Sequence, residues 1–312
     1  MQTQLVNSDC IKHLKTLDDN IFDSCVTDPP YHLTSIAKRF TNGTEAKHGK
    51  DGSFQRLSKG FMGQEWDGGD IAFTTELWKE VYRVLKPGAV LLAFSATRNY
   101  HRMAVAVEDS GFQIFDMINW IYGSGFPKRK NYLKPAHEPI VMARKGVNPS
   151  LNIDDCRTQS GRYPANIIHD GSEKVINEFK KFGEDKGAKA PVKIEQGDFR
   201  FYDHKYNKRG DDGESFKGDT GTAARFFYCA KASKKEKANT KHPTVKPVEL
   251  MRYLVKLVTP KDGIVLDPFA GTGTTGEACI LENKKYYLIE RGETYFKDIK
   301  TRLNRYGGLG IW

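Results

Sequence analysis

The sequence predicts an α/β domain with a mostly parallel sheet, helices on both faces of that sheet, and a polar insert between its two halves. Apolar runs with strand spacing alternate with runs of helical spacing over residues 1–145 and again over residues 242–312. Residues 146–241 between them are polar, rich in glycine and lysine, and weakly periodic. We therefore expect one domain joined through an insert, in which residues 181–222 are partly disordered unless a ligand orders them.

The individual elements follow from apolar spacing and from helix stops. Between residues 75 and 85, for example, apolar side chains recur at helical spacing until Lys86-Pro87-Gly88, which is expected to end the helix before a buried strand begins at residue 89. The strands expected on this basis are 5–6, 21–27, 89–94, 112–122, 139–143, 263–266 and 286–289. The expected helices are 10–17, 75–85, 100–110, 248–258, 276–281 and a terminal helix after Glu290.

Composition narrows the classes of function. The formal net charge of +10 suits a polyanionic partner such as nucleic acid, although a basic protein without such a partner has the same charge. The five cysteines are scattered without a C-x-x-C pair and the histidines lack metal-ligand spacing, which argues against disulfides and a metal site. The N-terminus resembles no signal peptide and the apolar runs are too short to span a membrane, so we expect a cytoplasmic protein.

Residues 264–276, I-V-L-D-P-F-A-G-T-G-T-T-G, have the pattern of a strand, a glycine-rich turn and a helix start. Glycines let the backbone approach a ligand closely, and a helix N-terminus offers free N–H groups to an anion. Glu290 ends the next predicted strand, where a carboxylate can bind two ribose hydroxyls. Gly271, Gly273 and Gly276 also spell the G-x-G-x-x-G of dinucleotide sites, whereas the missing lysine disfavours an ATPase. The motif favours a cofactor site over an ordinary tight turn without choosing the cofactor.

A second motif, Asp28-Pro29-Pro30-Tyr31, lies at the end of another predicted strand, where α/β sheets bind ligands. Asp28 is an acceptor, and the two prolines lack N–H groups and keep the residues before them extended. The carbonyl groups of Asp28 and Pro29 can therefore face a ligand without competing donors, while Tyr31 offers a flat ring for stacking. The motif suits a planar group that carries an NH₂, and the alternative is a turn with a packed tyrosine.

Together the two motifs resemble the amino-methyltransferases of DNA, whose signatures are D-P-P-Y and D-P-F-x-G-x-G-T. Residues 242–247, H-P-T-V-K-P, resemble the family's H-P-T-x-K-P element, and Ser8-Asp9-Cys10 resembles its G-D-C turn with serine in place of glycine. The catalytic motif precedes the cofactor motif, as in the circularly permuted β class. Residues 122–128 and 161–166 resemble methylases of phages and prophages.

The resemblance implies a Rossmann-like fold of S-adenosylmethionine (AdoMet)-dependent methyltransferases. Residues 1–145 would then be the catalytic half, 242–312 the cofactor-binding half, and 146–241 a target-recognition insert. Within the cofactor half, Phe269 would pack against AdoMet and Glu290 would bind its ribose.

Further cofactor contacts are implied in the same way. Asp9 would accept from the adenine amino group of AdoMet. The glycines of the turn would pass close to the methionine part and its threonines would bond the carboxylate. Lys246 would be a further carboxylate partner or else a solvated lysine. The cofactor-binding residues so implied are Asp9, Cys10, Lys246, Asp267, Phe269, Ala270, Gly271, Thr272, Gly273, Thr274 and Glu290.

The catalytic residues that the resemblance implies are Asp28, Pro29, Pro30 and Tyr31. A base inside a duplex cannot reach them, so it would be flipped out. Tyr31 would stack on it, while Asp28 and the Pro29 carbonyl would accept its amino hydrogens and aim the nitrogen at the sulfonium methyl. No Pro-Cys nucleophile motif is present, which disfavours C5-cytosine methylation.

Contacts to DNA are expected from a basic cluster with aromatic neighbours, which comprises Lys128, Arg129, Lys130 and Lys134. Lys231, Lys234, Lys235 and Lys237 form a second run of charge. Each run is equally compatible with a solvated face.

The resulting hypothesis is a site-specific N6-adenine DNA methyltransferase that uses AdoMet, binds double-stranded DNA and needs no metal or membrane. Asp28 favours adenine, because members of the family that act on cytosine often have serine there. The alternatives are N4-cytosine methylation, an NAD-dependent oxidoreductase, and a catalytically decayed DNA-binding protein. A homodimer and a cognate restriction nuclease are left open as partners.

Overall fold

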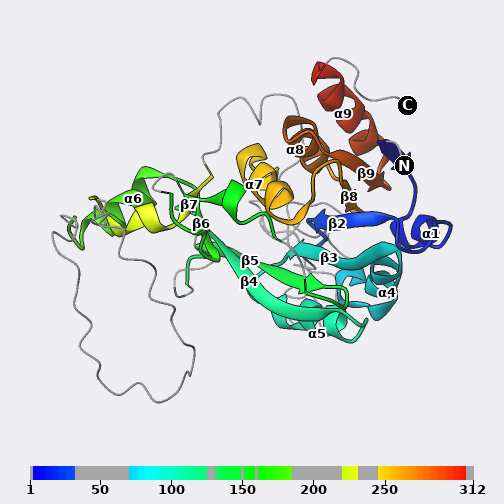
Figure 1. Ribbon diagram of the computed structural model, residues 1–312, viewed down its shortest axis with the longest axis horizontal. Helices are drawn as coiled ribbons and strands as arrows, with labels where there is room; N and C mark the ends of the chain where they lie inside the picture. Colours follow the sequence, from blue (N-terminus) through cyan, green and yellow to red (C-terminus); the bar gives the residue numbers. More distant parts are fainter. Residues whose placement is uncertain are drawn as a thin grey trace, which may run out of the picture.

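The computed structural model describes residues 3–31, 70–123, 125, 131, 133–148, 151–158, 161–184, 220–230 and 245–306. In these parts of the chain, nine strands form one sheet in the order β1-β9-β8-β2-β3-β5-β4-β6-β7 (Figure 1). The strands are β1 (Gln4–Asn7), β2 (Phe22–Thr27), β3 (Leu85–Phe94), β4 (Gln113–Ile121), β5 (His137–Arg144), β6 (Ile167–His169), β7 (Tyr228–Cys229), β8 (Ile264–Asp267) and β9 (Lys285–Glu290). The α-helices are α1 (Cys10–Leu14), α4 (Thr75–Val84), α5 (Tyr100–Glu108), α6 (Glu173–Lys180), α7 (Val248–Val258), α8 (Thr274–Leu281) and α9 (Glu293–Leu303).

The sheet joins the two ends of the chain at its centre. Strand β2 pairs in parallel with β8, with Cys25 opposite Leu266, although the two residues belong to opposite halves of the sequence. Strands β1, β9, β8, β2 and β3 run parallel, whereas β5 runs antiparallel to both β3 and β4. Because parallel strands end at the same edge, the segments that follow β2 and β8 lie side by side.

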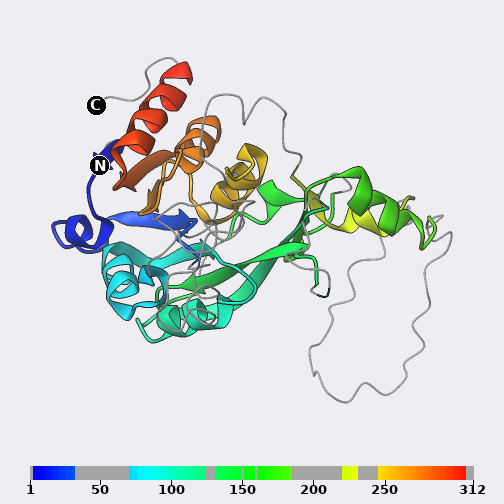
Figure 2. The same ribbon diagram turned by 180° about the vertical axis from the view of Figure 1, so that it is seen from behind.

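Helices cover both faces of the sheet, as the sequence predicted. Figures 1 and 2 show α4 and α5 on one side and α7, α8 and α9 on the other. Strand β3 explains the arrangement, because its apolar side chains alternate between two cores. Val90, Leu92 and Phe94 belong to the core under α7 to α9, while Leu91 and Ala93 belong to the core under α1, α4 and α5. Burying each large apolar side chain of this kind stabilises the fold by about 1.5–3 kcal/mol.

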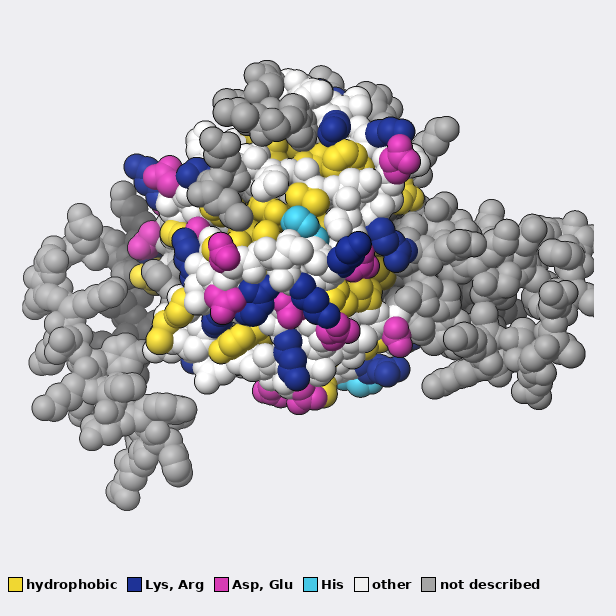
Figure 3. Space-filling view, turned by 90° about the vertical axis from the view of Figure 1, so that its right-hand side faces the viewer, with side chains coloured by type: hydrophobic (Ala, Val, Ile, Leu, Met, Phe, Trp, Pro, Cys, Tyr) yellow, Lys and Arg dark blue, Asp and Glu magenta, His cyan; other side chains and the backbone are white. Residues whose placement is uncertain are grey.

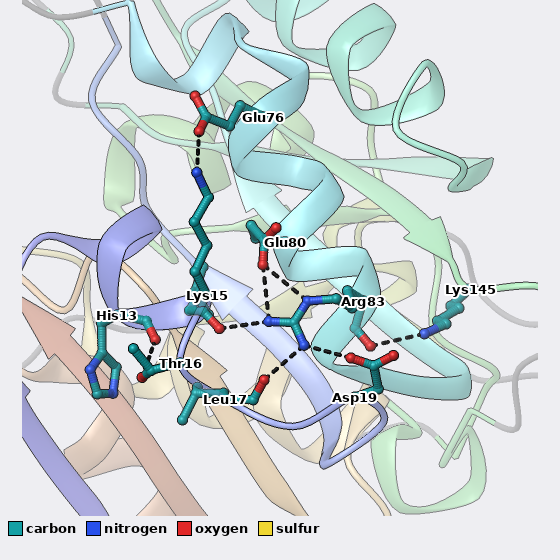
Figure 4. A network of polar contacts seen from close by, with 10 residues as sticks. His13, Lys15, Thr16, Leu17, Asp19, Glu76, Glu80, Arg83 and Lys145 are labelled. Carbon is teal, nitrogen blue, oxygen red and sulfur yellow. Dashed lines mark hydrogen bonds and ion pairs between the residues drawn. The ribbon is translucent and has the colours of Figure 1, made fainter.

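Polar contacts fix α4 to the segment that follows α1 (Figure 4). The Arg83 guanidinium donates to the carbonyl oxygens of Leu14 and Leu17, each at 2.7 Å, and pairs with Asp19 at 2.5 Å. Lys15 reaches back to Glu76 on α4 at 2.6 Å. On the face in Figure 3, Lys and Arg side chains lie among Asp and Glu side chains, so the positive excess is not gathered there.

The described part of the insert extends the sheet beyond β4. Asn119 pairs with Ile167 of β6, and Ile168 pairs with Tyr228 of β7, both in parallel. Helix α6 lies beside these strands at one end of the molecule (Figure 2). Most of residues 181–222, for which we expected partial disorder, lie outside the described residues.

Two element boundaries differ from the expectation by three residues or more. Strand β3 begins at Leu85, directly after α4, and includes Lys86-Pro87-Gly88, which we had expected to lie between helix and strand. Gly88 has a φ of 83°, and its N–H donates to the Lys145 carbonyl at 2.7 Å, so the irregular segment is still paired. Helix α1 ends at Leu14 rather than residue 17, because Thr16 and Leu17 bond the carbonyls three residues back.

No helix in the described ranges is long and apolar enough to cross a membrane. The same residues hold no group of three or more His, Cys, Asp or Glu side chains that could bind a metal ion.

Candidate active site

Four side chains meet at the edge of the sheet where β2 ends, and we call them the Asp28 cluster: Asp28, Tyr31, Glu138 and Lys246. The Lys246 ammonium nitrogen lies 2.6 Å from Asp28 Oδ2 and 3.2 Å from Glu138 Oε2. The Tyr31 hydroxyl lies 2.7 Å from Asp28 Oδ1 and 2.9 Å from Glu138 Oε2, and it has one proton to donate to either of them. Lys246 also donates to the Tyr31 hydroxyl at 3.0 Å.

The charges of the cluster follow from burial and pairing. Burial by itself lowers the pKa of Lys246, but the carboxylates of Asp28 and Glu138 outweigh burial and raise the pKa above its ordinary value. Burial, followed by the same two charges, raises the pKa of Tyr31 well above its ordinary value. The cluster therefore holds an ammonium, a neutral hydroxyl and two carboxylates. A buried charge of this kind is stable only because it is paired.

Lys246 lies on the Asp28 side of the site. The sequence left two interpretations of Lys246 open: it binds the carboxylate of the cofactor, or it is a solvated lysine. Only 8% of the residue is exposed, with its nitrogen 4.8 Å from the centre of the Phe94 ring, so the solvated reading is wrong. Among the described residues, it pairs with the carboxylates of Asp28 and Glu138. Residues 242–244 of the H-P-T-V-K-P element lie outside the described residues.

The backbone of the D-P-P-Y segment is held from α5. The Asn99 side chain, at the N-terminus of α5, donates to the Tyr31 carbonyl at 2.7 Å. Pro29 is buried, whereas Asp28, Pro30 and Tyr31 are partly exposed at the edge of the sheet. Sequence reasoning identified this segment but missed Asn99 and Glu138, because neither stands in a local motif.

The glycine-rich turn, residues 267–276, connects β8 to α8. Gly271 and Gly273 have φ values of 55° and 80°, which favour glycine. A Cβ on Gly273 would lie 2.9 Å from the Ile299 side chain on α9, whereas one on Gly271 would meet, among the described residues, only the Phe269 carbonyl at 3.9 Å. The turn is therefore packed tightly against α9 at Gly273 and open at Gly271.

Glu290 holds the open side of this turn. Its carboxylate accepts the Gly271 N–H at 2.9 Å and the Gly292 N–H at 2.6 Å. Burial raises the pKa of Glu290, and these two N–H groups partly offset the effect. Each oxygen keeps a further lone pair for a ligand.

Asp9 lies at the end of the strand next to Glu290. Strand β1 pairs with β9 so that Asn7 is opposite Glu290, and the Asp9 side chain accepts the Lys12 N–H at 3.0 Å at the start of α1. Cys10 is buried behind it, and burial raises the pKa of its thiol to about 12. A thiol with that pKa stays neutral at pH 7 and acts as a small apolar side chain.

Asp267 links the turn to the D-P-P-Y segment. It is buried and accepts from the Thr27 hydroxyl at 2.7 Å, the Phe269 N–H at 3.0 Å and the Thr275 hydroxyl at 2.5 Å. Burial raises its pKa to about 6, although these three donors favour the charged form. Since Thr27 directly precedes Asp28, one carboxylate positions both motifs relative to each other.

The other residues of the turn are largely engaged within the protein. The Thr272 hydroxyl accepts from Arg302 on α9 at 3.1 Å, and Arg302 forms a buried ion pair with Glu277. Ala270 and Thr274 are buried, and Phe269 is partly buried against the core under α4. Arg302 and Glu277 are a support that sequence reasoning did not find.

Only one of the four basic residues expected to contact DNA can be placed. Lys134 is exposed and donates to the Gly123 carbonyl at 2.9 Å. Lys128, Arg129 and Lys130 lie outside the described residues, as do the lysines between positions 231 and 237.

Similar sequences point to one family. The model of the N6/N4 DNA methylase family matches residues 22–301. The type II methyltransferase M.HindIII of Haemophilus influenzae is 27% identical over 344 residues, covering 96% of this chain and 94% of its own length. The type II methyltransferase M.HpaI of Haemophilus parainfluenzae is 25% identical, covering 97% of this chain and 75% of its own length.

Solved structures show the same fold. The PvuII DNA methyltransferase, which is specific for cytosine N4, superposes with a TM-score of 0.56 at 15% identity, over 99% of this chain and 93% of its own. The complex of M1.HpyAVI with SAM gives a TM-score of 0.51 at 18% identity, over 96% of this chain and 98% of its own. These likenesses confirm the predicted fold class. With the family match over most of the sequence, they lead to one conclusion: the chain belongs to the N6/N4 family of DNA methylases.

Proposed function

We propose that this DNA methyltransferase transfers the methyl group of AdoMet to the exocyclic N6 of adenine in double-stranded DNA. The observation that carries the proposal is the juxtaposition of two sites at one edge of the sheet. The Asp28 cluster follows β2, the glycine-rich turn follows β8, and Asp267 bonds to Thr27 beside Asp28. A donor and an acceptor of a methyl group bound at these two sites would lie next to each other.

The cofactor side fits a nucleoside with a short charged tail. Gly271 leaves open space where any other residue would carry a side chain, so its backbone is accessible to a ligand. Glu290 ends β9 and Asp9 follows the adjacent strand β1 by two residues, and their carboxylates suit ribose hydroxyls and an adenine amino group. AdoMet bound there would supply an electrophilic methyl group on a sulfonium.

The base side fits a flipped base. Flipping costs a few kcal/mol, which the stacking of Tyr31 on the base would offset. Asp28 and the carbonyl of Pro29 would accept the amino hydrogens, which holds the nitrogen in place and directs its lone pair toward the methyl group. The bond from the amino nitrogen to the methyl group would form as the bond from the sulfonium sulfur to that methyl group breaks, which would leave a neutral thioether, and the nitrogen would lose one proton. Positioning and these acceptors would supply the catalysis, and no covalent intermediate with the protein is needed.

The choice of adenine over cytosine depends on position 28. Aspartate there is typical of family members that methylate adenine, whereas those that methylate cytosine N4 often have serine. A carboxylate is also a stronger acceptor than a hydroxyl. Both bases present an amino group beside a ring nitrogen, so N4-methylcytosine is the alternative product.

Nucleoside analysis tests the proposal. The protein is incubated with methyl-labelled AdoMet and unmethylated duplex DNA, and the digested DNA is analysed by mass spectrometry. We expect label in N6-methyldeoxyadenosine. Label in N4-methyldeoxycytidine would overturn the choice of base and leave the site assignment standing, whereas DNA without label would overturn the proposed function.

We further propose that residues 146–241 select the DNA sequence, because every chemical motif lies outside them. Exchanging residues 147–238 with those of a related methylase should move the methylated site and preserve the product base. Sequencing of methylated DNA gives the result, and an unchanged site would assign recognition to another segment.

A further inference from the structure

We propose that Glu138 is a positioning residue for methyl transfer. When the target amino group binds Asp28, Lys246 and the Tyr31 hydroxyl move their hydrogen bonds from Asp28 to Glu138, which serves as a second acceptor. The inference rests on the proposed function, in which Asp28 binds the amino group of the flipped base. Glu138 lies outside the D-P-P-Y, H-P-T-V-K-P and glycine-rich motifs.

The first observation is that each oxygen of Asp28 already lies within hydrogen-bond distance of a donor. Lys246 lies 2.6 Å from Oδ2 and the Tyr31 hydroxyl 2.7 Å from Oδ1. The bond from Lys246 is charge-assisted and therefore stronger than the bond that a neutral amino group could form. An amino group that binds Asp28 therefore competes with this ammonium for the carboxylate, and moving Lys246 to another acceptor would strengthen the bond from Asp28 to the amino group.

The second observation is that one oxygen of Glu138 lies within reach of both donors. Glu138 Oε2 is 3.2 Å from the Lys246 nitrogen and 2.9 Å from the Tyr31 hydroxyl. Its backbone is fixed in β5, opposite Trp120 of β4. A small movement of either donor therefore exchanges Asp28 for Glu138 and breaks no contact in the sheet.

The surroundings of Lys246 show why a second acceptor is needed. Its neighbours are Asp28 and Tyr31 after β2, Glu138 on β5, the Phe94 ring on β3 and, at longer range, Tyr122 after β4. Within the described residues, Asp28 and Glu138 are the two carboxylates that pair with it. Without Glu138, releasing Asp28 would leave a buried ammonium unpaired, which is strongly unfavourable.

The experiment measures the single-turnover rate of methyl transfer, with enzyme in excess and AdoMet saturating, together with AdoMet affinity by calorimetry. Glu138→Gln keeps the size and an acceptor for the Tyr31 hydroxyl but removes the charge that Lys246 needs. We expect its rate to fall by about tenfold or more, with AdoMet affinity within about twofold of wild type. Glu138→Asp shortens the side chain by one methylene and so moves its charge away from Lys246, and it should give an intermediate rate. The matched control is Glu76→Gln, which breaks an exposed lysine pair remote from the site and should leave the rate unchanged.

A double-mutant cycle separates this role from a structural one. Lys246→Met removes the ammonium that needs a second acceptor, so this variant should retain measurable methyl transfer. Adding Glu138→Gln to it should then change the rate by less than about twofold. If Glu138→Gln lowers the rate equally with and without Lys246, Glu138 is merely structural and the inference is overturned. A Lys246→Met protein that unfolds like wild type but is inactive also overturns it.

The outcomes also separate this inference from the function beneath it. If the wild-type protein leaves no label in DNA, the proposed function itself fails, whereas methyl transfer by Asp28→Ala at the wild-type rate removes the role of Asp28 and this inference with it. If Asp28→Ala is inactive while Glu138→Gln has the wild-type rate, only the role of Glu138 fails.

Discussion

The glycine-rich turn and the Asp28 cluster lie at the ends of neighbouring strands but are constructed differently. The turn is local: its conformation depends on positive φ values at Gly271 and Gly273, and Glu290 meets it from the next strand along the chain. The cluster is assembled from three distant parts of the sequence, so that Lys246 reaches Asp28 across 218 positions. The proposed cofactor side is thus specified by backbone geometry and the proposed base side by the placement of charges. Substitutions on the two sides should therefore change different quantities, the rate of methyl transfer on one side and the affinity for AdoMet on the other.

The largest effect is expected on the base side, from Asp28→Ala. Loss of the acceptor should lower the rate of methyl transfer at saturating AdoMet by at least about 100-fold, the scale of one lost transition-state hydrogen bond. Asp19→Ala, which removes an exposed carboxylate paired with Arg83, is the control and should keep the wild-type rate. An Asp28→Ala rate close to wild type would remove this residue from the chemistry.

On the cofactor side, Glu290→Ala should weaken AdoMet binding. The ribose hydroxyls and the N–H groups of Gly271 and Gly292 would lose their acceptor, at a cost of about 1–3 kcal/mol, or roughly fivefold to 150-fold in affinity. Calorimetric titration measures the affinity. Glu293→Ala, three residues further on and exposed, should bind AdoMet like wild type. Equal affinity in the two variants would contradict the role of Glu290.

Phe269→Ala should weaken AdoMet binding less, by about 1–2 kcal/mol, through lost apolar packing on the cofactor. The same titration applies. Because Phe269 also packs on the core under α4, the midpoint of thermal unfolding must be measured in parallel. A lower midpoint with unchanged affinity would show that Phe269 supports the fold and does not touch AdoMet.

Gly273→Ala tests the backbone directly and should destabilise the fold by about 1–2 kcal/mol from the left-handed φ alone, with a further loss from the clash with Ile299. Gly146→Ala is a matched control, because Gly146 has a φ of 69° but no atom of the described residues within 4 Å of its Cβ position. The free energy of unfolding of each variant is measured in urea, and the difference between the two losses gives the contribution of the clash. Equal losses would mean that α9 yields to a side chain at position 273.

The smallest effect is expected from Lys15→Met. Lys15 pairs with Glu76 at 2.6 Å, the same distance as in the Lys246–Asp28 pair (Figure 4). The side chains of Lys15 and Glu76 are both exposed, however. Exposed pairs are screened by water and contribute little. The unfolding midpoint and the rate of transfer should therefore match wild type. A clear loss would show that distance, and not burial, determines the strength of such pairs in this molecule.

The two regions also differ in how far the sequence predicted them. The turn and the D-P-P-Y segment could be identified because their residues are contiguous and each follows a predicted strand. Glu138 and Asn99 could not, since a single glutamate or asparagine near a strand or helix end has no distinguishing pattern. Lys246 stands in a recognisable element, yet its burial against Asp28 depends on tertiary packing.

The strand boundaries also depend on tertiary pairing that the local sequence does not show. Spacing predicted the centres of the strands, but β3 begins four residues before residue 89, because Phe22 on β2 pairs with Leu85 across a local irregularity. The link from Asp267 to Thr27 has the same origin, because it exists only where β8 lies beside β2.

The central claim is that the two sides have separate tasks, and calorimetric titration of AdoMet into Asp28→Ala tests it most directly. Because Asp28 is assigned to the target base, its variant should bind AdoMet with an affinity within about twofold of wild type, a difference of less than about 0.5 kcal/mol, even though it does not transfer the methyl group. An affinity reduced as far as that of Glu290→Ala would contradict the division and assign Asp28 to the cofactor site.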